Sequence, residues 1–212
     1  MKIGGLVLCG GKSSRMTISK ATLPFGPEPM LQRVVRLLRE IVSPIVVAAA
    51  PTQLLPELPS DVVIARDEQE GLGPLAGLAA GLDAFPSDVQ AAYVTGCDVP
   101  LLVPAFVQRM IDELGEYEIA VPVDHEFHHP LAAVYRTTVI HHVRTLLSEN
   151  RLRPFFLFER TDTRRVPVFE LQTVDPDLRT LMNLNLPADY FTALRLAGFE
   201  PTPEIVARLS SG

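Results

Sequence analysis

The segment GLVLCGGKSSRM, residues 5–16, places a glycine pair beside basic and hydroxyl side chains. A Walker-type loop needs a lysine directly after the second of two glycines five positions apart, and the segment fails this test in both registers. Glycine still lets backbone N–H groups approach a ligand closely, and Lys12 and Arg15 suit phosphate oxygens. Two interpretations stay open, a phosphate-binding turn or an ordinary strand-to-helix turn, and the residue types favour the first.

A carboxylate follows an apolar run in the segment YVTGCDVPLL. Asp98 comes directly after this run, and Pro100 turns the chain away from it. One interpretation is a Mg²⁺ ligand, because Mg²⁺ takes oxygen ligands from one or two carboxylates together with substrate phosphates. The alternative is that Asp98 caps a helix that begins near Val103 or bonds within the turn. A phosphate-binding turn on the first strand would favour the metal ligand.

Two further polar pairs occur downstream, in LMNLNLPADY and NRLRPFFLFER. Asn183 and Asn185 alternate around a leucine, so an extended chain would point both amides to one side. Asn185 could also cap the helix expected over residues 188–196, but capping explains only one of the two. Arg151 and Arg153 either bind an anionic substrate or decorate an exposed turn, and the exposed turn is favoured.

The segment DHEFHHP contains the HExxH spacing of zinc proteases, from His125 to His129. That motif needs a helix, which brings its two histidines to one face. Pro122 and Pro130 bracket the segment and strand-like runs flank it, so a helix is not expected here. We expect a loop in which one histidine faces a substrate, with His125 and His128 as surface residues.

Composition excludes several classes of protein. The chain has 212 residues and a formal net charge of −6, which argues against a general nucleic-acid binder. It contains no apolar run of the length needed for a membrane span. The first strand is expected within three residues of the start, leaving no room for a signal peptide. Cys9 and Cys97 end apolar runs, so we expect reduced, buried thiols in a cytoplasmic protein.

Short β-rich runs alternate with helical stretches through the first half of the chain. This order predicts an α/β, Rossmann-like, doubly wound and mostly parallel sheet with a small antiparallel extension. Ligands bind at the carboxyl ends of strands in such sheets, where the polar clusters fall. Gly77 and Gly81, at helical spacing, predict close packing of their helix. The expected strands are 3–9, 45–50, 62–66, 91–95, 118–123, 130–135 and 165–169, and the expected helices are 30–42, 74–85, 103–114, 137–149 and 188–196.

The motifs LCGGKSSRM, CDVPLL, HHPLAAVYR, RLRPFFLF and LMNLNLP, in this order, resemble those of the molybdenum cofactor guanylyltransferases. This family belongs to the α/β nucleotidyltransferases that include the sugar-nucleotide pyrophosphorylases. The resemblance covers residues 3–197. It implies one nucleotidyltransferase domain over residues 1–200 and a C-terminal tail over residues 201–212, which forms either a short helix or a partly disordered end.

The resemblance also implies roles for individual residues. Catalysis would involve Arg15, Lys20 and Asp98, with Mg²⁺ held by Asp98 and Asn185. The nucleotide would be bound by Leu8, Gly10, Gly11, Lys20, Asp67 and Asp98. His129 and Arg153 would lie on the side that binds the pterin substrate.

The implied reaction joins GMP from GTP to the phosphate of molybdopterin and releases pyrophosphate, with molybdoenzymes or cofactor-delivery proteins as transient partners. Two departures from the family pattern bear on it. Relatives read RMGxDK where this chain reads RMTISK, with Thr17 and Ser19 replacing glycine and aspartate, and Ala48-Ala49-Ala50 stands where GTP-using relatives carry an asparagine. The alternatives are CTP as donor, a sugar or alditol phosphate as acceptor, or a non-catalytic relative that binds nucleotide or cofactor.

Overall fold

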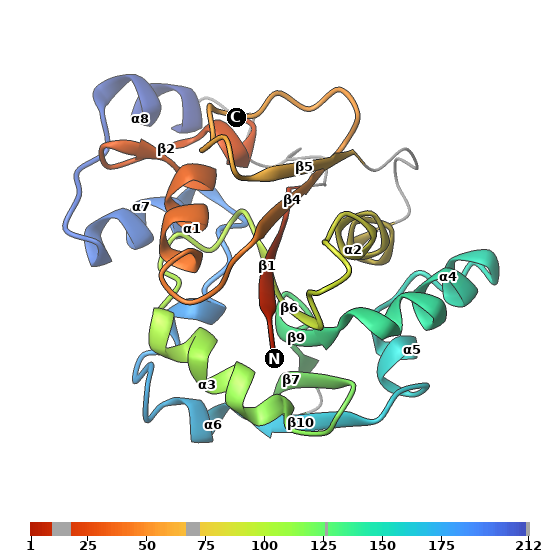
Figure 1. Cartoon of the computed structure of the whole chain (residues 1–212). Coiled ribbons are helices and arrows are strands. Elements are labelled where there is room, and N and C mark those ends of the chain that lie inside the picture. Colours follow the sequence, from red (N-terminus) through yellow and green to blue (C-terminus); the bar gives the residue numbers. More distant parts are fainter. Residues whose placement is uncertain (10–17, 67–72, 126, 211–212) are drawn as a thin grey trace.

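A mostly parallel sheet runs through the centre of the molecule, with helices on both faces (Figure 1). The computed structural model describes residues 1–9, 18–66, 73–125 and 127–210. The strand order is β10-β7-β9-β6-β1-β4-β5, with β8 paired to β7. The strands are β1 (Ile3–Leu8), β4 (Ile45–Ala49), β5 (Val63–Arg66), β6 (Ala91–Gly96), β7 (Ile119–Asp124), β8 (Phe127–His128), β9 (Ala132–Arg136) and β10 (Thr163–Pro167).

The predicted fold class is confirmed, including the antiparallel extension. Strand β1 pairs in parallel with both β4 and β6, and β4 pairs in parallel with β5. Strand β9 then runs antiparallel to β6 and β7. The strand expected over residues 165–169 is displaced to Thr163–Pro167, and Phe169 lies in the following helix. A proline has no N–H to continue a ladder, so Pro167 is a natural last residue for the strand.

Helices α1 and α3 cover one face of the sheet, and α2, α4 and α5 cover the other (Figure 1). Four of the helices have proline at their first position, where the missing N–H breaks no helical bond: Pro74, Pro104, Pro187 and Pro203. The helices are α1 (Met30–Leu38), α2 (Pro74–Asp83), α3 (Pro104–Leu114), α4 (Ile140–Ser148), α5 (Phe155–Phe158), α6 (Val168–Leu171), α7 (Pro187–Leu196) and α8 (Pro203–Ser210), with 3₁₀ turns η1 (Lys20–Thr22), η2 (Thr137–Val139) and η3 (Arg179–Leu181).

The strand side chains alternate between two hydrophobic clusters. In β1, Val7 belongs to the cluster under α1 and α3, whereas Leu6 and Leu8 belong to the cluster under α2 and α4. A third cluster joins the hairpin of β2 (Pro24–Phe25) and β3 (Glu28–Pro29) to α7 and α8, with Phe25 and Tyr190 fully packed inside it. Burial on both faces fixes the register of β1 and therefore where its carboxyl end lies.

The last helix of the described chain, α8, packs onto the third cluster. Its Ile205 and Leu209 side chains are buried against the β2–β3 hairpin and α7. Residues 203–210 of the C-terminal segment therefore form a helix, the first of the two alternatives expected for this segment. Within the described ranges, none of the helices has the length and apolar composition needed to cross a membrane.

The close packing predicted for the α2 glycines is confirmed most clearly at Gly81. A Cβ atom there would lie 2.3 Å from the Leu6 side chain, whereas a Cβ at Gly77 would meet Leu8 at an ordinary 3.4 Å. Leu6 is fully buried and its surroundings are occupied. Helix α2 can therefore approach β1 because residue 81 has no side chain.

We expect Gly81→Ala to lower the free energy of unfolding by about 1–2 kcal/mol, because overpacking outweighs the gain in helix propensity. Gly77→Ala is the matched control and should leave stability unchanged or raise it by up to about 1 kcal/mol, since the new methyl group has room. Urea denaturation of both variants measures the difference. Equal effects of the two substitutions would show that the Gly81–Leu6 contact does not limit the packing.

Candidate active site

Asp98 lies in the connection between β6 and α3, residues 97–103, which we call the Asp98 turn. The turn begins at the carboxyl end of β6, where the Cys97 N–H donates to the Leu8 carbonyl of the neighbouring β1. A Cβ atom at Gly96 would lie 2.5 Å from Asp98 Oδ1. The carboxylate therefore folds back over the strand end through space that only glycine leaves free.

Three side chains predicted for the site meet here. Lys20, the first residue of η1, places its Nζ 2.8 Å from Asp98 Oδ2 and 3.3 Å from Asn185 Oδ1. The Lys20 and Asp98 side chains retain only 17% and 20% of their exposure, so their ion pair is largely shielded from water. One ammonium group thus donates to two oxygen acceptors from segments far apart in the sequence.

The position of Asn185 follows from two sets of backbone contacts. The Leu184 N–H donates to the Asp98 carbonyl at 3.0 Å, which ties the segment before α7 directly to the Asp98 turn. The backbone N–H groups of Asn185 and Leu186 donate to Asp189 Oδ2 at 3.0 and 2.8 Å. The Asp189 side chain therefore accepts the N–H groups at the start of α7, and the Asn185 side chain does not. The Asn185 amide oxygen instead accepts a hydrogen bond from Lys20. The alternative of Asn185 as a helix cap is wrong.

A buried carboxylate, that of Asp175, holds the 3₁₀ turn η3, which in turn contacts the end of the Asp98 turn. Asp175 is 2% exposed and accepts the N–H groups of Arg179 at 2.9 Å and Thr180 at 2.8 Å. Thr180 Oγ1 in turn accepts the N–H of Val103 at the end of the Asp98 turn, at 3.0 Å. The capping alternative for Asp98 is also wrong, because the helix that follows has no side-chain cap and Val103 is satisfied by Thr180. Sequence reasoning missed Asp175, whose VDPD setting indicates only a loop.

The carboxyl ends of β1 and β4 are joined by Gln53, which the sequence also did not single out. Its Nε2 donates to the Cys9 carbonyl at 2.9 Å, and its Oε1 accepts the Ala50 N–H at 3.4 Å. Arg66, the last residue of β5, donates to the carbonyls of Ala50 and Gln53. These contacts fix the chain just after β4. Gln53 and Arg66 thereby hold the ends of β1, β4 and β5 together.

The structure describes some of the other predicted site residues and not the rest. Leu8 ends β1 and lines a small cavity together with Pro74, Pro130 and Pro154. Pro130 follows His129 and Pro154 follows Arg153, so both predicted substrate residues neighbour the wall of a cavity that includes the end of β1. Neither residue hydrogen-bonds to Lys20, Asp98 or Asn185 in the described part of the chain. Gly10, Gly11, Arg15 and Asp67 lie outside the described residues.

His129 differs from the two histidines before it. Its backbone N–H donates to the Pro122 carbonyl at 2.9 Å, and its Nε2 atom is buried without a hydrogen-bond partner among the described residues. Burial lowers the pKa of the imidazole, which favours the neutral form. His125 is almost fully exposed, and the HExxH spacing falls on the β7–β8 hairpin, so the protease motif has no helix to act on. The expectation of a non-helical segment is confirmed.

Comparison with known proteins identifies the class. Residues 5–164 match the MobA-like NTP transferase domain. A probable molybdenum cofactor guanylyltransferase of Mycobacterium avium is 34% identical over 194 residues, covering 89% of this chain and 93% of that protein. One from Mycobacterium tuberculosis is 36% identical over 188 residues, covering 86% and 89%. The protein is thus a nucleotidyltransferase.

Solved structures share its fold at low identity. The molybdopterin-guanine dinucleotide biosynthesis protein A of Archaeoglobus fulgidus superposes with a TM-score of 0.76 at 20% identity, over 93% of this chain and 99% of that one. The 2-C-methyl-D-erythritol 4-phosphate cytidylyltransferase of Thermus thermophilus gives 0.66 at 15% identity, over 92% and 98%. The chain belongs to the MobA-like NTP transferase family. The resemblance noted in the sequence is confirmed.

We expect Asp175→Ala to lower the free energy of unfolding by about 1–3 kcal/mol, because two backbone N–H groups lose their acceptor. Asp177→Ala is the matched control, since the contact that Asp177 makes among the described residues is an exposed ion pair with Arg179, and its loss should change stability by less than about 0.5 kcal/mol. Thermal unfolding of the two variants provides the measurement. Similar stabilities would mean that Asp175 does not anchor the segment.

Proposed function

We propose that this protein transfers GMP from GTP to the terminal phosphate of molybdopterin and releases pyrophosphate. The observation that carries the proposal is the convergence of Lys20, Asp98 and Asn185 at the carboxyl ends of the central strands. Relatives at 34–36% identity over most of the chain bear the name molybdenum cofactor guanylyltransferase, which supports the same donor and acceptor. One of the structures with this fold is a cytidylyltransferase, so proteins of this fold can use different nucleotides as donors.

The reaction needs charge stabilisation and positioning more than proton transfer. An oxygen of the acceptor phosphate forms a new bond to the α-phosphorus of GTP, and the bond to the bridging oxygen of the β-phosphate breaks. Pyrophosphate leaves with that electron pair. The acceptor phosphate is already ionised near neutral pH, so it can attack without a general base. Lys20 supplies a shielded positive charge beside the place where negative charge gathers, and Arg15 would add a second.

The donor set fits Mg²⁺. The Asp98 carboxylate and the Asn185 amide oxygen both lie within hydrogen-bond distance of one ammonium group, so they can also serve one cation. Mg²⁺ favours such oxygen donors and keeps water and substrate phosphates as its other ligands. When bound, the ion would offset the charge of the triphosphate. Lys20 would then exchange its present partners for phosphate oxygens.

The described residues include groups that can bind phosphate, but they include no side chain placed to select the base. Ala48 and Ala49 are buried in β4 and present no side-chain donor to a base. Guanine would have to be read by backbone groups in the turn that Gln53 and Arg66 hold, or by residues outside the described ranges. CTP with the same acceptor, a sugar or alditol phosphate as acceptor, and a non-catalytic role are the alternatives that the test must separate.

The test is calorimetric titration with GTP, CTP, ATP and UTP in the presence of Mg²⁺, followed by pyrophosphate release with molybdopterin as acceptor. We expect GTP to bind at least about tenfold more tightly than the others and to support turnover, a difference of about 1.4 kcal/mol in binding free energy. Preference for CTP would keep the chemistry but change the product. Absence of binding by every nucleotide would contradict the proposal and favour the non-catalytic relative.

Substitutions at the site should separate chemistry from folding. We expect Asp98→Asn and Lys20→Ala each to lower kcat by about a hundredfold or more, because each removes charge that acts in the transition state. Lys2→Ala is the matched control, since Lys2 forms an exposed ion pair with Asp88 at the amino ends of β1 and β6, at the opposite edge of the sheet from the site. Circular dichroism should show all three variants folded. Near-normal turnover of Asp98→Asn with Mg²⁺ would remove the proposed metal role.

A further inference from the structure

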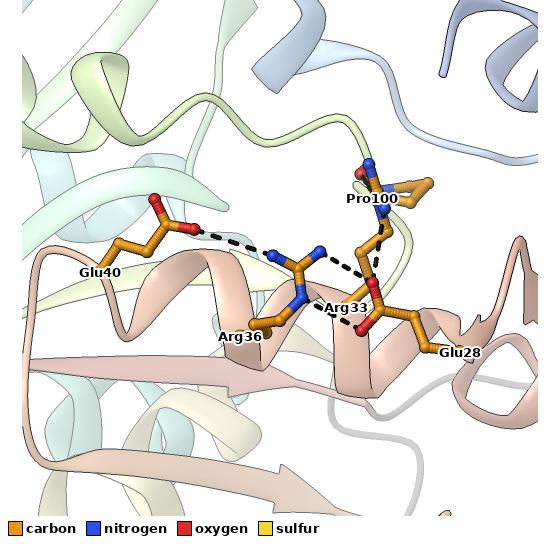
Figure 2. A network of polar contacts seen from close by, with 5 residues as sticks. All are labelled: Glu28, Arg33, Arg36, Glu40 and Pro100. Atoms are coloured by element: carbon orange, nitrogen blue, oxygen red, sulfur yellow. Dashed lines mark hydrogen bonds and ion pairs between the residues drawn. The ribbon is translucent and has the colours of Figure 1, made fainter. Parts of the chain in front are cut away.

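A partly buried arginine on α1, Arg33, contacts the backbone of the Asp98 turn. Arg33 Nε donates to the Pro100 carbonyl at 2.7 Å, two residues after Asp98 (Figure 2). The Arg33 side chain is 16% exposed, and its guanidinium lies 5.1 Å from the ring centroid of Phe25 and 5.5 Å from that of Phe199. A short, charged hydrogen bond in such a shielded place is stronger than one in water.

The positive charge of Arg33 is balanced by Glu28, which precedes α1. Arg33 Nη1 lies 3.4 Å from Glu28 Oε1, and Arg36 donates to both oxygens of the same carboxylate, at 2.8 and 3.2 Å (Figure 2). Hydrogen bonds from Arg36, and then the charges of both arginines, lower the pKa of Glu28 and keep it ionised. Arg36 itself is half-exposed and continues outward to Glu40. Of the two arginines, Arg33 alone contacts the Asp98 turn.

We propose that Arg33 is a positioning residue for the reacting centre. Resting on the function proposed above, the inference is that its bond to Pro100 holds the Asp98 turn so that the carboxylate faces Lys20 and Asn185. The same guanidinium packs on the ring of Phe199. Helix α7 lies between Asn185 and Phe199 in the sequence. One side chain therefore contacts both the turn that carries Asp98 and a residue that lies just beyond α7, the helix that follows Asn185.

Backbone hydrogen exchange tests this without any substrate. The Leu184 N–H donates to the Asp98 carbonyl, so its exchange rate reports how firmly the Asp98 turn is held. We expect Arg33→Met to speed exchange at Leu184 by about tenfold or more, because a hydrogen bond to a charged donor is lost while the apolar stem still packs. Arg36→Met is the matched control: it removes the other arginine of Glu28 and should leave the Leu184 rate within about twofold.

Turnover supplies the second readout. Arg33→Met should lower kcat by about tenfold with little change in the KM for GTP, because orientation is lost and not nucleotide contact. Arg33→Lys should recover part of the loss in both measurements, since an ammonium group can still donate to the Pro100 carbonyl. A merely structural role would instead lower the melting temperature and leave the Leu184 rate and kcat unchanged under conditions where the variant is folded.

The two proposals fail in different ways. If Leu184 exchanges at the same rate in Arg33→Met and Arg36→Met, the positioning role is wrong whatever the protein catalyses. If the wild-type protein turns over no nucleotide, the proposed function is wrong, and the exchange comparison still decides whether Arg33 holds the turn. Should Arg33→Met not fold, Arg33→Leu against Arg36→Leu gives the same comparison, because leucine also has no group that can donate to the Pro100 carbonyl, and equal Leu184 rates there overturn the inference.

Discussion

The hydrogen bonds from one ammonium group to two side-chain oxygen atoms are the interaction on which the site depends. Lys20 joins Asp98 and Asn185 where both members of the ion pair have lost most of their contact with water. Removing charges from water is costly, so such a pair forms only where the surrounding chain already holds its members in place. The structure around the pair is accordingly dense in hydrogen bonds between side chains and backbone. The site is therefore preorganised before any substrate arrives.

The Asp98 turn is held from several directions. The parallel register of β1 and β6 sets its start, because Leu8 lies opposite Gly96 and its carbonyl accepts the next N–H. Thr180, oriented through Asp175, holds its end, and Leu184 holds Asp98 itself. The supports come from β1 and from residues 175–184, both far from Asp98 in the sequence. Loss of one support should therefore alter the direction of the carboxylate more readily than it unfolds the domain.

Much of this arrangement could be predicted from the sequence. Apolar runs ending in polar residues indicated the strands, and the carboxyl-end rule for α/β sheets then placed Lys20 and Asp98 at one edge. The alternation of Asn183 and Asn185 indicated a shared orientation, but only the structure shows Asp189 serving α7 and leaving Asn185 free for Lys20. The family resemblance linked these residues into one site.

The supports could not be predicted in the same way. Arg33 and Thr180 act on backbone atoms 67 and 77 residues away, and a backbone partner leaves no pattern in residue types. Arg33 by itself resembles any arginine on an amphipathic helix. Asp175 is followed by one proline and a second aspartate, a setting that indicates an exposed loop, yet it is buried because its carboxylate satisfies N–H groups of η3. Such residues are recognised only when the tertiary contacts are known.

The central claim is that Asp98 and Asn185 form one oxygen site that Lys20 completes. Anomalous scattering from crystals of the protein grown with Mn²⁺ and a non-hydrolysable GTP analogue tests it most directly. The account predicts a manganese peak within about 2.5 Å of both Asp98 and Asn185 oxygens, with Lys20 Nζ moved onto a phosphate. A metal bound away from Asp98, or Lys20 still paired with Asp98 while nucleotide and metal are bound, would contradict it.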